Sequence, residues 1–314
     1  MLKRTLASVA ACSLLALASA AHAGDRPLKS VGVTVGDLAN PFFVAIGQGA
    51  TEEAHKINPN AQVTVVSAKY DLNTQVGQIE NFIANKVDLI VLGAADSKGI
   101  APAVKKAEKA GIVVVAVDVA AEGADATVMS DNTMAGAESC KFIAEQLHGQ
   151  GNVVIVNGPP VSSIMDRVSG CKAEFAKTPG IKVLSDNQNA GGSRDGGLSS
   201  MSNLLTAFPK IDAVFGINDP TAIGAELAIR QAKRTDVKLI GGVDGAPDGE
   251  RALKDPKSLF AVSPAQDPHR MAVESVDVGY GLMNGKAPAE KVKLLPTPPV
   301  TRANVDSYQG WVRN

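Results

Sequence analysis

The sequence has 314 residues, with 31 basic and 32 acidic side chains and a formal net charge of −1 at neutral pH. Its basic residues are dispersed and only 4% of the residues are aromatic, so the sequence lacks the basic, aromatic-rich patch typical of nucleic-acid-binding proteins. A chain of this length is large for one hydrophobic core and predicts two domains.

The first 23 residues have the pattern of a secretory signal peptide. Lys3 and Arg4 precede an apolar run over residues 6–21, and Ala21-His22-Ala23 forms a small-x-small cleavage site. We therefore predict cleavage after Ala23, a mature chain that begins at Gly24, and export to the periplasm. No later segment has 18 uninterrupted apolar residues, so we expect no direct insertion into the membrane.

The cysteines leave one alternative open and suggest one cross-link. Cys12 ends a lipoprotein-like box, Val9-Ala10-Ala11-Cys12, but cleavage there would leave a very short apolar region, so release as a soluble protein is favoured. In an oxidising compartment, the two remaining cysteines, Cys140 and Cys171, favour a disulfide. Neither has a paired Cys or His at ligand spacing, so no metal site is predicted.

Short apolar segments alternate with amphipathic helical patterns from Ser30 onward. This alternation predicts an α/β fold of two Rossmann-like lobes, each with a parallel sheet built from right-handed βαβ units. The strand candidates are residues 31–35, 62–67, 89–93, 113–117, 153–156, 182–185, 213–217 and 238–242, and the clearest helix candidates are 41–56, 74–85 and 100–109.

Three breaks in this alternation predict where the chain passes between the lobes. They lie near Asp131, Pro264 and Pro296, and they are candidates for a three-crossing hinge. The last break is rich in proline, which favours a stiff connection. The predicted lobes are residues 24–131 with 265–295 and residues 132–264 with 296–314.

The end of the first predicted strand has an unusual composition. Asp37 follows the strand, and Asn40-Pro41-Phe42-Phe43 then opens a helix, with Asn40 at the N-cap and Pro41 at the first helical position. In open α/β sheets, ligands bind beyond the carboxyl ends of the strands. Two polar side chains beside two aromatic rings would suit a small polar ligand with a flat apolar face, although both rings could also be ordinary core.

Other predicted strands also end in carboxylate or amide side chains. Asp118, Asn218 with Asp219, and Asp244 each follow an apolar run. Carboxylates accept hydrogen bonds from hydroxyls, and amides both donate and accept. Each residue alone is more often a cap or turn residue, but together they indicate a hydroxyl-rich ligand.

These motifs, in this order, carry a family resemblance from about residue 30 to about residue 287. The chain resembles the sugar-binding proteins of ABC importers with the type I periplasmic fold, and among them the ribose-binding proteins. The resemblance rests on Asn40-Pro41-Phe42-Phe43, Asn203-Leu204-Leu205-Thr206-Ala207, Asn218-Asp219 followed by Ala222-Ile223-Gly224-Ala225, Asp244-Gly245-Ala246-Pro247-Asp248-Gly249-Glu250, and Ala265-Gln266.

The resemblance implies roles for the matching residues. Phe42 and Phe43 would line or stack on a sugar ring, and Asp37 would face the cleft. The side chains implied to bond sugar hydroxyls are Asn40, Asp118, Asn218, Asp244 and Gln266.

Several positions depart from the ribose-binding pattern. Val119 and Met165 stand where that pattern has sugar-facing arginines, Gly93 replaces an asparagine, and Gly192 replaces an aromatic. Arg167, two residues after Met165, matches a further arginine of the family. These changes imply a larger or differently shaped ligand than ribose, with Arg167 or Arg194 supplying the missing donors.

The implied mechanism is binding without chemistry. A sugar or polyol would hold the two lobes closed, and a membrane permease would recognise the closed form. We expect a monomer without cofactors. The alternative is a chemoreceptor or quorum-signal binding protein of the same fold with a non-sugar or modified-sugar ligand.

Two other classes fit the sequence less well. Asp118 and Asp244 could be the carboxylate pair of a glycosidase, but hydroxyl binding already explains both, and no GxGxxG after a strand, GxxxxGK[ST], HExxH or GxSxG motif occurs. A lactose-repressor-type regulator would carry an N-terminal helix-turn-helix where this chain has a signal-peptide pattern.

Overall fold

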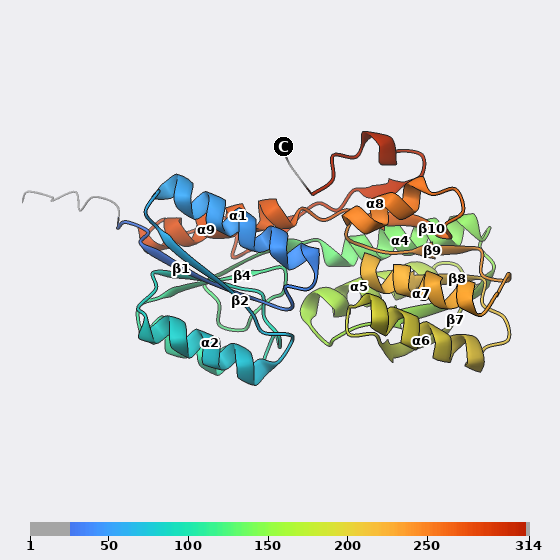
Figure 1. The fold of residues 1–314 in the computed structure, drawn as a ribbon, viewed down its shortest axis with the longest axis horizontal. Coiled ribbons are helices and arrows are strands. Elements are labelled where there is room, and N and C mark those ends of the chain that lie inside the picture. Colours follow the sequence, from blue (N-terminus) through green and yellow to red (C-terminus); the bar gives the residue numbers. More distant parts are fainter. Residues whose placement is uncertain (1–25, 312–314) are drawn as a thin grey trace, which may run out of the picture.

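The computed structural model describes residues 26–311, and its two α/β lobes lie side by side along the long axis of the molecule (Figure 1). Each lobe is built on a six-stranded sheet with helices on both faces. The predicted fold of two lobes with parallel sheets is therefore confirmed. The predicted signal peptide, its cleavage site after Ala23 and the box at Cys12 lie outside the described residues.

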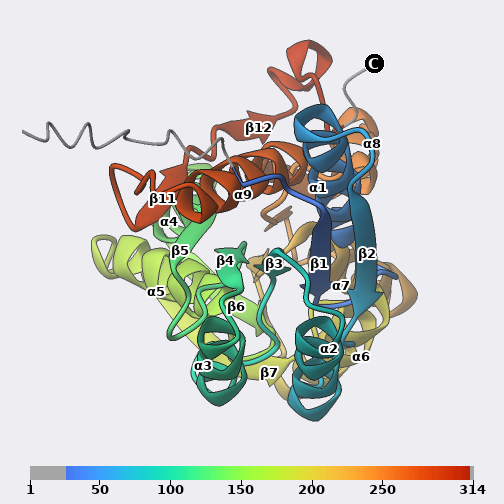
Figure 2. The same ribbon diagram turned by 90° about the vertical axis from the view of Figure 1, so that its left-hand side faces the viewer.

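The sheet of the first lobe is entirely parallel, with strand order β11-β5-β4-β3-β1-β2 (Figure 2). Its central strands are continuous apolar runs because helices cover both faces of the sheet. The strands are β1 (Ser30–Val35), β2 (Gln62–Ser67), β3 (Leu89–Leu92), β4 (Val113–Val117), β5 (Ala126–Ser130) and β11 (Val292–Leu295).

Four helices cover this sheet. Helices α1 (Pro41–Ile57) and α9 (Pro268–Met283) pack together on one face, and α2 (Leu72–Ala84) and α3 (Ala101–Lys109) lie on the other (Figure 2). Helix α1 begins where the sequence predicts, because the Asn40 side chain accepts a hydrogen bond from the Phe42 amide at 3.0 Å. This cap fixes the residue at which α1 begins and so places Phe42 in the first turn of the helix.

The sheet of the second lobe has the order β12-β10-β9-β8-β6-β7, and only β12 runs antiparallel to its neighbour β10. The strands are β6 (Gly151–Asn157), β7 (Ile181–Asn189), β8 (Ala213–Gly216), β9 (Leu239–Gly241), β10 (Phe260–Pro264) and β12 (Pro299–Thr301).

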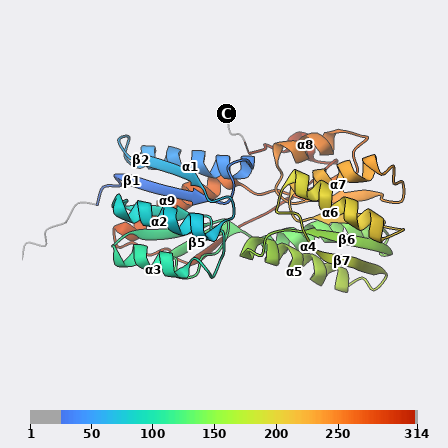
Figure 3. The same ribbon diagram turned by 60° about the horizontal axis from the view of Figure 1, so that its bottom comes forward.

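Helices lie on both sides of the sheet that contains β6 (Figure 3). Alternate residues of β6 join the cores on the two sides. Val153 and Ile155 join the core formed with α4 (Asn132–Gln146) and α5 (Ser162–Ala176). Val154 and Val156 join the core on the other face. The helices of that second face are α6 (Arg194–Ala207), α7 (Asp219–Gln231) and α8 (Pro247–Lys254), and the short 3-10 helix η1 (Val305–Ser307) follows β12.

The chain passes between the two sheets three times. It does so from β5 to α4 at Asp131, from β10 to α9 at residues 265–267, and from β11 to β12 at residues 296–298. Hydrogen bonds tie these crossings together, since the Asp131 amide donates to the Leu295 carbonyl at 2.9 Å and the Ala265 amide to the Pro298 carbonyl at 2.8 Å. The three crossings lie at the three predicted breaks.

A disulfide joins α4 to α5 through Cys140 and Cys171, both fully buried. Glycines let these two helices approach closely. A Cβ atom at Gly136 would lie 1.9 Å from the Arg167 carbonyl oxygen, and one at Gly170 would lie 2.0 Å from that of Thr133. This contact holds α4 and α5 together as one layer beside the hinge.

Among residues 26–311, no helix has the length and apolar character needed to cross a bilayer.

Candidate ligand-binding site

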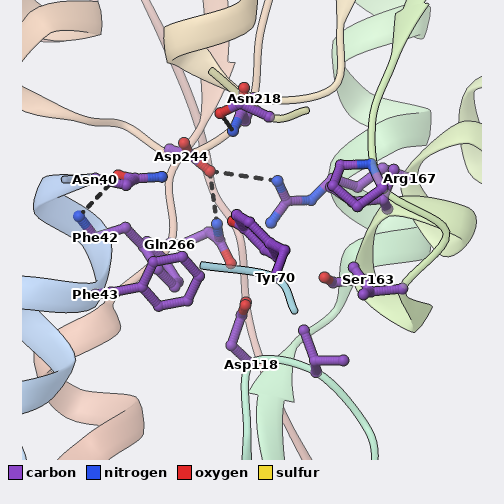
Figure 4. Close-up of a pocket in the computed structure, with 15 residues that line it drawn as sticks. Asn40, Phe42, Phe43, Tyr70, Asp118, Ser163, Arg167, Asn218, Asp244 and Gln266 are labelled. Atoms are coloured by element: carbon purple, nitrogen blue, oxygen red, sulfur yellow. Dashed lines mark hydrogen bonds and ion pairs between the residues drawn. The ribbon is translucent and has the colours of Figure 1, made fainter. Parts of the chain in front are cut away.

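A cavity lies between the lobes, beyond the carboxyl ends of strands from both sheets (Figure 4). We call it the inner cavity. The first lobe contributes Asn40, Phe42, Phe43, Tyr70, Asp118 and Val119 to its lining. The second lobe contributes Pro159, Val161, Ser163, Ile164, Arg167, Gly192, Asn218 and Asp244, and the crossing from β10 to α9 contributes Gln266.

Aromatic rings form the wall on the first lobe. Phe42 and Phe43 lie edge to face with ring centroids 5.3 Å apart. Tyr70 also packs edge to face against Phe43, with ring centroids 6.0 Å apart. On the second lobe, the wall near the start of α5 includes the aliphatic side chains of Val161 and Ile164. The site thus offers apolar surface from both lobes, which suits a ligand with a flat apolar face.

A buried cluster of charged and polar side chains forms the base of the site. Arg167, only 3% exposed, lies 3.4 Å from Asp244 through Nη1 and Oδ1, and the Gln266 amide donates to the same Oδ1 at 2.7 Å. Arg167 also donates to the Ile217 carbonyl at 3.0 Å and to Asn132 Oδ1 at 2.8 Å. These contacts hold the guanidinium and the Asp244 carboxylate in fixed positions beside the cavity (Figure 4).

Two acceptor atoms of this site have no hydrogen-bond partner within the described part of the chain. They are Asp118 Oδ1 and Gln266 Oε1, and both are buried. A buried acceptor that lacks a donor costs roughly 1–3 kcal/mol. Both residues line the inner cavity, so hydroxyl donors placed there would satisfy both atoms.

The two carboxylates of the site are held on strained backbone. Asp118 has φ 65° and Asp244 has φ 143°, both in the region that favours glycine. Such strain is most often found at functional sites, where the surrounding structure holds it. At the ends of β4 and β9, it places one carboxylate from each lobe at the cavity.

Burial makes both carboxylates harder to ionise. It raises the pKa of Asp118 to about 7; the Arg167 guanidinium opposes this shift and the Asp244 charge adds to it. Burial also raises the pKa of Asp244, against the opposing effects of Arg167 and the Gln266 hydrogen bond. Asp118 therefore titrates close to neutral pH.

Asn218 connects the cavity to α7. Its side-chain oxygen caps that helix by accepting from the Thr221 amide at 3.0 Å, and its Nδ2 donates to the Gly192 carbonyl at 2.9 Å. Asn218 is thus a helix cap that also lines the cavity.

The predicted site residues do not all meet at the inner cavity. Asp37 lines a neighbouring cavity instead, and its Oδ1 accepts from the Ala39 amide at 3.0 Å. Met165 lines neither cavity and is 50% exposed. Met165 precedes the buried Arg167 by two positions on α5. Two residues correspond to a rotation of about 200° around the helix axis, so the two side chains lie on opposite faces. The predicted residues that line the inner cavity are Asn40, Phe42, Phe43, Asp118, Arg167, Asn218, Asp244 and Gln266.

Sequence reasoning missed several residues that line the cavity, among them Tyr70, Val161, Ser163 and Ile164. Tyr70 follows β2 as Asp37 follows β1, so the rule that ligands bind beyond strand ends could have pointed to it. The aliphatic residues near the start of α5 carry no such signal.

Trp311 packs behind the site, and no sequence motif predicts this position. Its ring meets Phe42 edge on with centroids 5.6 Å apart, and its Nε1–H donates to the Asp244 carbonyl at 3.0 Å. Trp311 is only 7% exposed and is the single tryptophan of the sequence. The C-terminal segment therefore supports one site residue from each lobe.

Beside the cavity, the lobes contact each other through Ser162, the first residue of α5. Its hydroxyl oxygen accepts from the Ala120 amide at 2.9 Å, and its amide donates to Ser97 Oγ at 3.1 Å. Ser97 and Ala120 belong to the first lobe, so these bonds form only when the lobes are closed.

The site combines buried hydrogen-bonding groups with apolar walls and lies between two lobes. Within residues 26–311, no three His, Cys, Asp or Glu side chains are grouped so that they could hold a metal ion. The arrangement is that of a binding site for a small molecule with several hydroxyl groups.

The family model described as periplasmic binding protein domain matches residues 31–287. The chain belongs to the periplasmic binding protein family. Among curated relatives of this periplasmic binding protein, the xylitol-binding protein of Mycolicibacterium smegmatis is 32% identical over 291 residues, which cover 90% of this chain and 80% of the relative. The ribose import binding protein RbsB of Salmonella typhimurium is 32% identical over 277 residues, covering 87% and 91%.

Solved structures of ABC transporter solute-binding proteins have the same fold as this periplasmic binding protein. One from Actinobacillus succinogenes with bound D-allose has a TM-score of 0.80 and 30% identity, and the match covers 89% of this chain and 100% of that one. One from Bacillus halodurans with bound myo-inositol has a TM-score of 0.81 and 27% identity, covering 91% and 99%.

Proposed function

We propose that this protein is the substrate-binding component of an ABC importer and that it binds a monosaccharide or related polyol between its two lobes. The observation that carries this proposal is the pair of unpartnered buried acceptors, Asp118 Oδ1 and Gln266 Oε1, at a cavity lined by both lobes. Relatives named for ribose and xylitol, and similar structures with bound D-allose and myo-inositol, support the same ligand class.

Each wall of the site has a role in this proposal. Asp118, Asp244 and Gln266 accept hydrogen bonds from ligand hydroxyls. Arg167 and Asn218 donate to ligand oxygens. Phe43 packs against the apolar face of the ring or carbon chain. Since groups of both lobes bond the ligand together, the ligand stabilises the closed arrangement through its higher affinity for that state.

The remaining properties follow from this role. We propose that the chain is exported with cleavage after Ala23, acts as a monomer, delivers its ligand to a membrane permease without catalysing a reaction, and needs no cofactor. The lobes would be residues 24–131 with 265–295 and residues 132–264 with 296–314. The closed pair of lobes is the surface that the permease would recognise.

A thermal-shift screen of the mature protein tests the ligand class. The panel contains D-ribose, D-allose, xylitol, myo-inositol and glycerol, with sodium acetate and L-leucine as controls of other chemistry. A ligand at about 100 times its Kd adds roughly 2.7 kcal/mol to the free energy of unfolding and raises the melting temperature by several degrees. We expect this shift for at least one sugar or polyol. A panel without any shift would contradict the proposal.

Binding should depend on pH through Asp118. Burial in the closed arrangement raises the pKa of Asp118 to about 7, so the carboxyl is mostly protonated there at pH 5. A ligand hydroxyl that donates to Asp118 favours the carboxylate and lowers this pKa, so binding releases a proton. We expect Kd, measured by calorimetry, to rise as the pH falls below 7, up to about tenfold per pH unit. The Asp118→Asn variant should lose this dependence, and a flat wild-type profile would show that binding does not ionise Asp118.

Weakening the contact between the lobes should lower affinity without changing the inner cavity. Ser162→Ala removes the hydroxyl that accepts from the Ala120 amide but does not alter a residue that lines the cavity. Losing one such bond costs about 1 kcal/mol, so we expect Kd to rise roughly fivefold at unchanged circular dichroism. Ser202→Ala on the exposed face of α6 is the matched control. Equal Kd values for both variants would mean that closure does not depend on this contact.

A further inference from the structure

A second cavity of about 210 Å³ lies next to the inner cavity and also between the lobes. We call it the outer cavity. Ala39 and Pro41 line it from the first lobe, and Pro220 and Ile223 line it from the second. None of the residues that contact the ligand in the proposed function lines it.

The two cavities share Asn40, Tyr70 and Gly192 in their linings. Gly192 has φ 67°, and a Cβ atom there would lie 3.5 Å from Asn218 Nδ2 and 3.9 Å from the Tyr70 hydroxyl. A larger side chain at this position would fill the space between the two cavities. Tyr70 and Gly192 come from opposite lobes, so lobe closure brings these two shared lining residues together.

The lining of the outer cavity indicates what it can hold. Pro41, Pro220 and Ile223 supply apolar surface. At its edge, Arg194 lies 3.8 Å from Asp248, and Asp248 also pairs with Arg251. An anionic group would have to compete with Asp248 for these guanidinium groups and would also approach Asp37, so a neutral occupant is favoured.

We propose that the protein accepts O-substituted sugars or polyols, with the ring or polyol chain in the inner cavity and a neutral alkyl or glycosyl substituent in the outer cavity. This proposal rests on the proposed function, because the inner cavity must bind the parent compound. Because Gly192 has no side chain, the substituent can extend from the inner into the outer cavity beside Tyr70. In the outer cavity, it contacts Pro41, Pro220 and Ile223.

Calorimetric titration with matched pairs of compounds tests the proposal. The pairs are D-ribose and D-allose with their α- and β-methyl glycosides, and myo-inositol with its monomethyl ethers. For at least one pair, we expect the substituted compound to bind within tenfold of its parent or more tightly. D-ribose 5-phosphate should bind at least tenfold more weakly than that substituted compound.

A variant that fills the outer cavity locates the substituent. Ala39 is exposed and lines only the outer cavity, so Ala39→Trp should fill part of it and leave the inner cavity open. We expect Kd for the substituted compound to rise at least tenfold and Kd for the parent to change less than twofold. Val44→Trp, on the exposed surface of α1 outside both cavities, is the matched control. If Ala39→Trp does not fold, Ala39→Phe replaces it.

The outcomes separate this inference from the proposed function. Binding of a parent without binding of any substituted compound would overturn the inference and leave the proposed function intact. Equal losses for parent and substituted compound in Ala39→Trp would also overturn it, as would tightest binding of D-ribose 5-phosphate. Absence of binding by all parents and all derivatives would overturn both.

Discussion

Replacing Asp244 by Asn is expected to lower the affinity for the ligand by more than about 100-fold. Asp244 accepts from Gln266 and pairs with Arg167 in a buried cluster at the cavity. The substitution leaves the Arg167 guanidinium without its carboxylate partner. It also removes a carboxylate oxygen of Asp244 that would accept from a ligand hydroxyl. Loss of a charged acceptor for a buried ligand hydroxyl costs about 3 kcal/mol, which corresponds to roughly 150-fold in Kd.

Calorimetric titration of the variant with the ligand found by screening measures this loss. Asp186→Asn is the matched control, because Asp186 pairs with Lys172 on the surface of the same lobe, away from both cavities. Circular dichroism and the melting temperature without ligand show whether Asp244→Asn still folds, and Asn218→Ala gives a second test if it does not. Wild-type affinity in a folded Asp244→Asn would show that the ligand binds elsewhere.

Removal of the disulfide is expected to lower the free energy of unfolding by about 3–4 kcal/mol. Cys140 and Cys171 are 31 residues apart, and the chain-entropy model gives this value for a closed loop of that length. The bond joins α4 to α5, and these two helices carry Asn132 and Arg167, which hydrogen-bond to each other beside the cavity. Its loss should therefore loosen the second lobe close to the site.

Urea unfolding of the wild type and of the Cys140→Ala, Cys171→Ala double variant measures this effect. The double variant should unfold at lower urea concentration, and dithiothreitol should lower the wild-type midpoint toward the same value. Dithiothreitol should not change the double variant, which serves as the control. Identical midpoints for the oxidised wild type and the double variant would contradict the expected stabilisation.

Local chemistry made much of the fold predictable. The β-branched run Val31, Val33 and Val35 is buried in a central parallel strand, and Asn40 caps α1 as its position before Pro41 predicts. The strand-end rule placed Asp118 and Asp244 at the same site, because carboxyl ends of parallel strands gather at one edge of each sheet. These inferences depend on local residue types and on the order of strands and helices along the chain.

Features that depend on tertiary contact were not predictable in the same way. The break near Pro264 begins only after that residue, because antiparallel pairing with β12 extends β10 to Pro264, beyond the last residue that pairs with β9. Val161 and Ile164 belong to the site only because the first lobe closes against the start of α5. Met165 was aligned to a sugar-facing position, but a shift of two residues on a helix moves a side chain to the opposite face.

Small-angle X-ray scattering of the mature protein, with and without the sugar or polyol that gives the largest thermal shift, tests lobe closure around the ligand most directly. Since Asp118 and Asp244 lie on different lobes and meet at one cavity, a ligand bonded to both should shift the population toward the closed arrangement. We expect the radius of gyration to fall on saturation with ligand and to stay unchanged in Asp244→Asn under the same conditions. Identical scattering curves for the free and the saturated wild-type protein would contradict closure around the ligand.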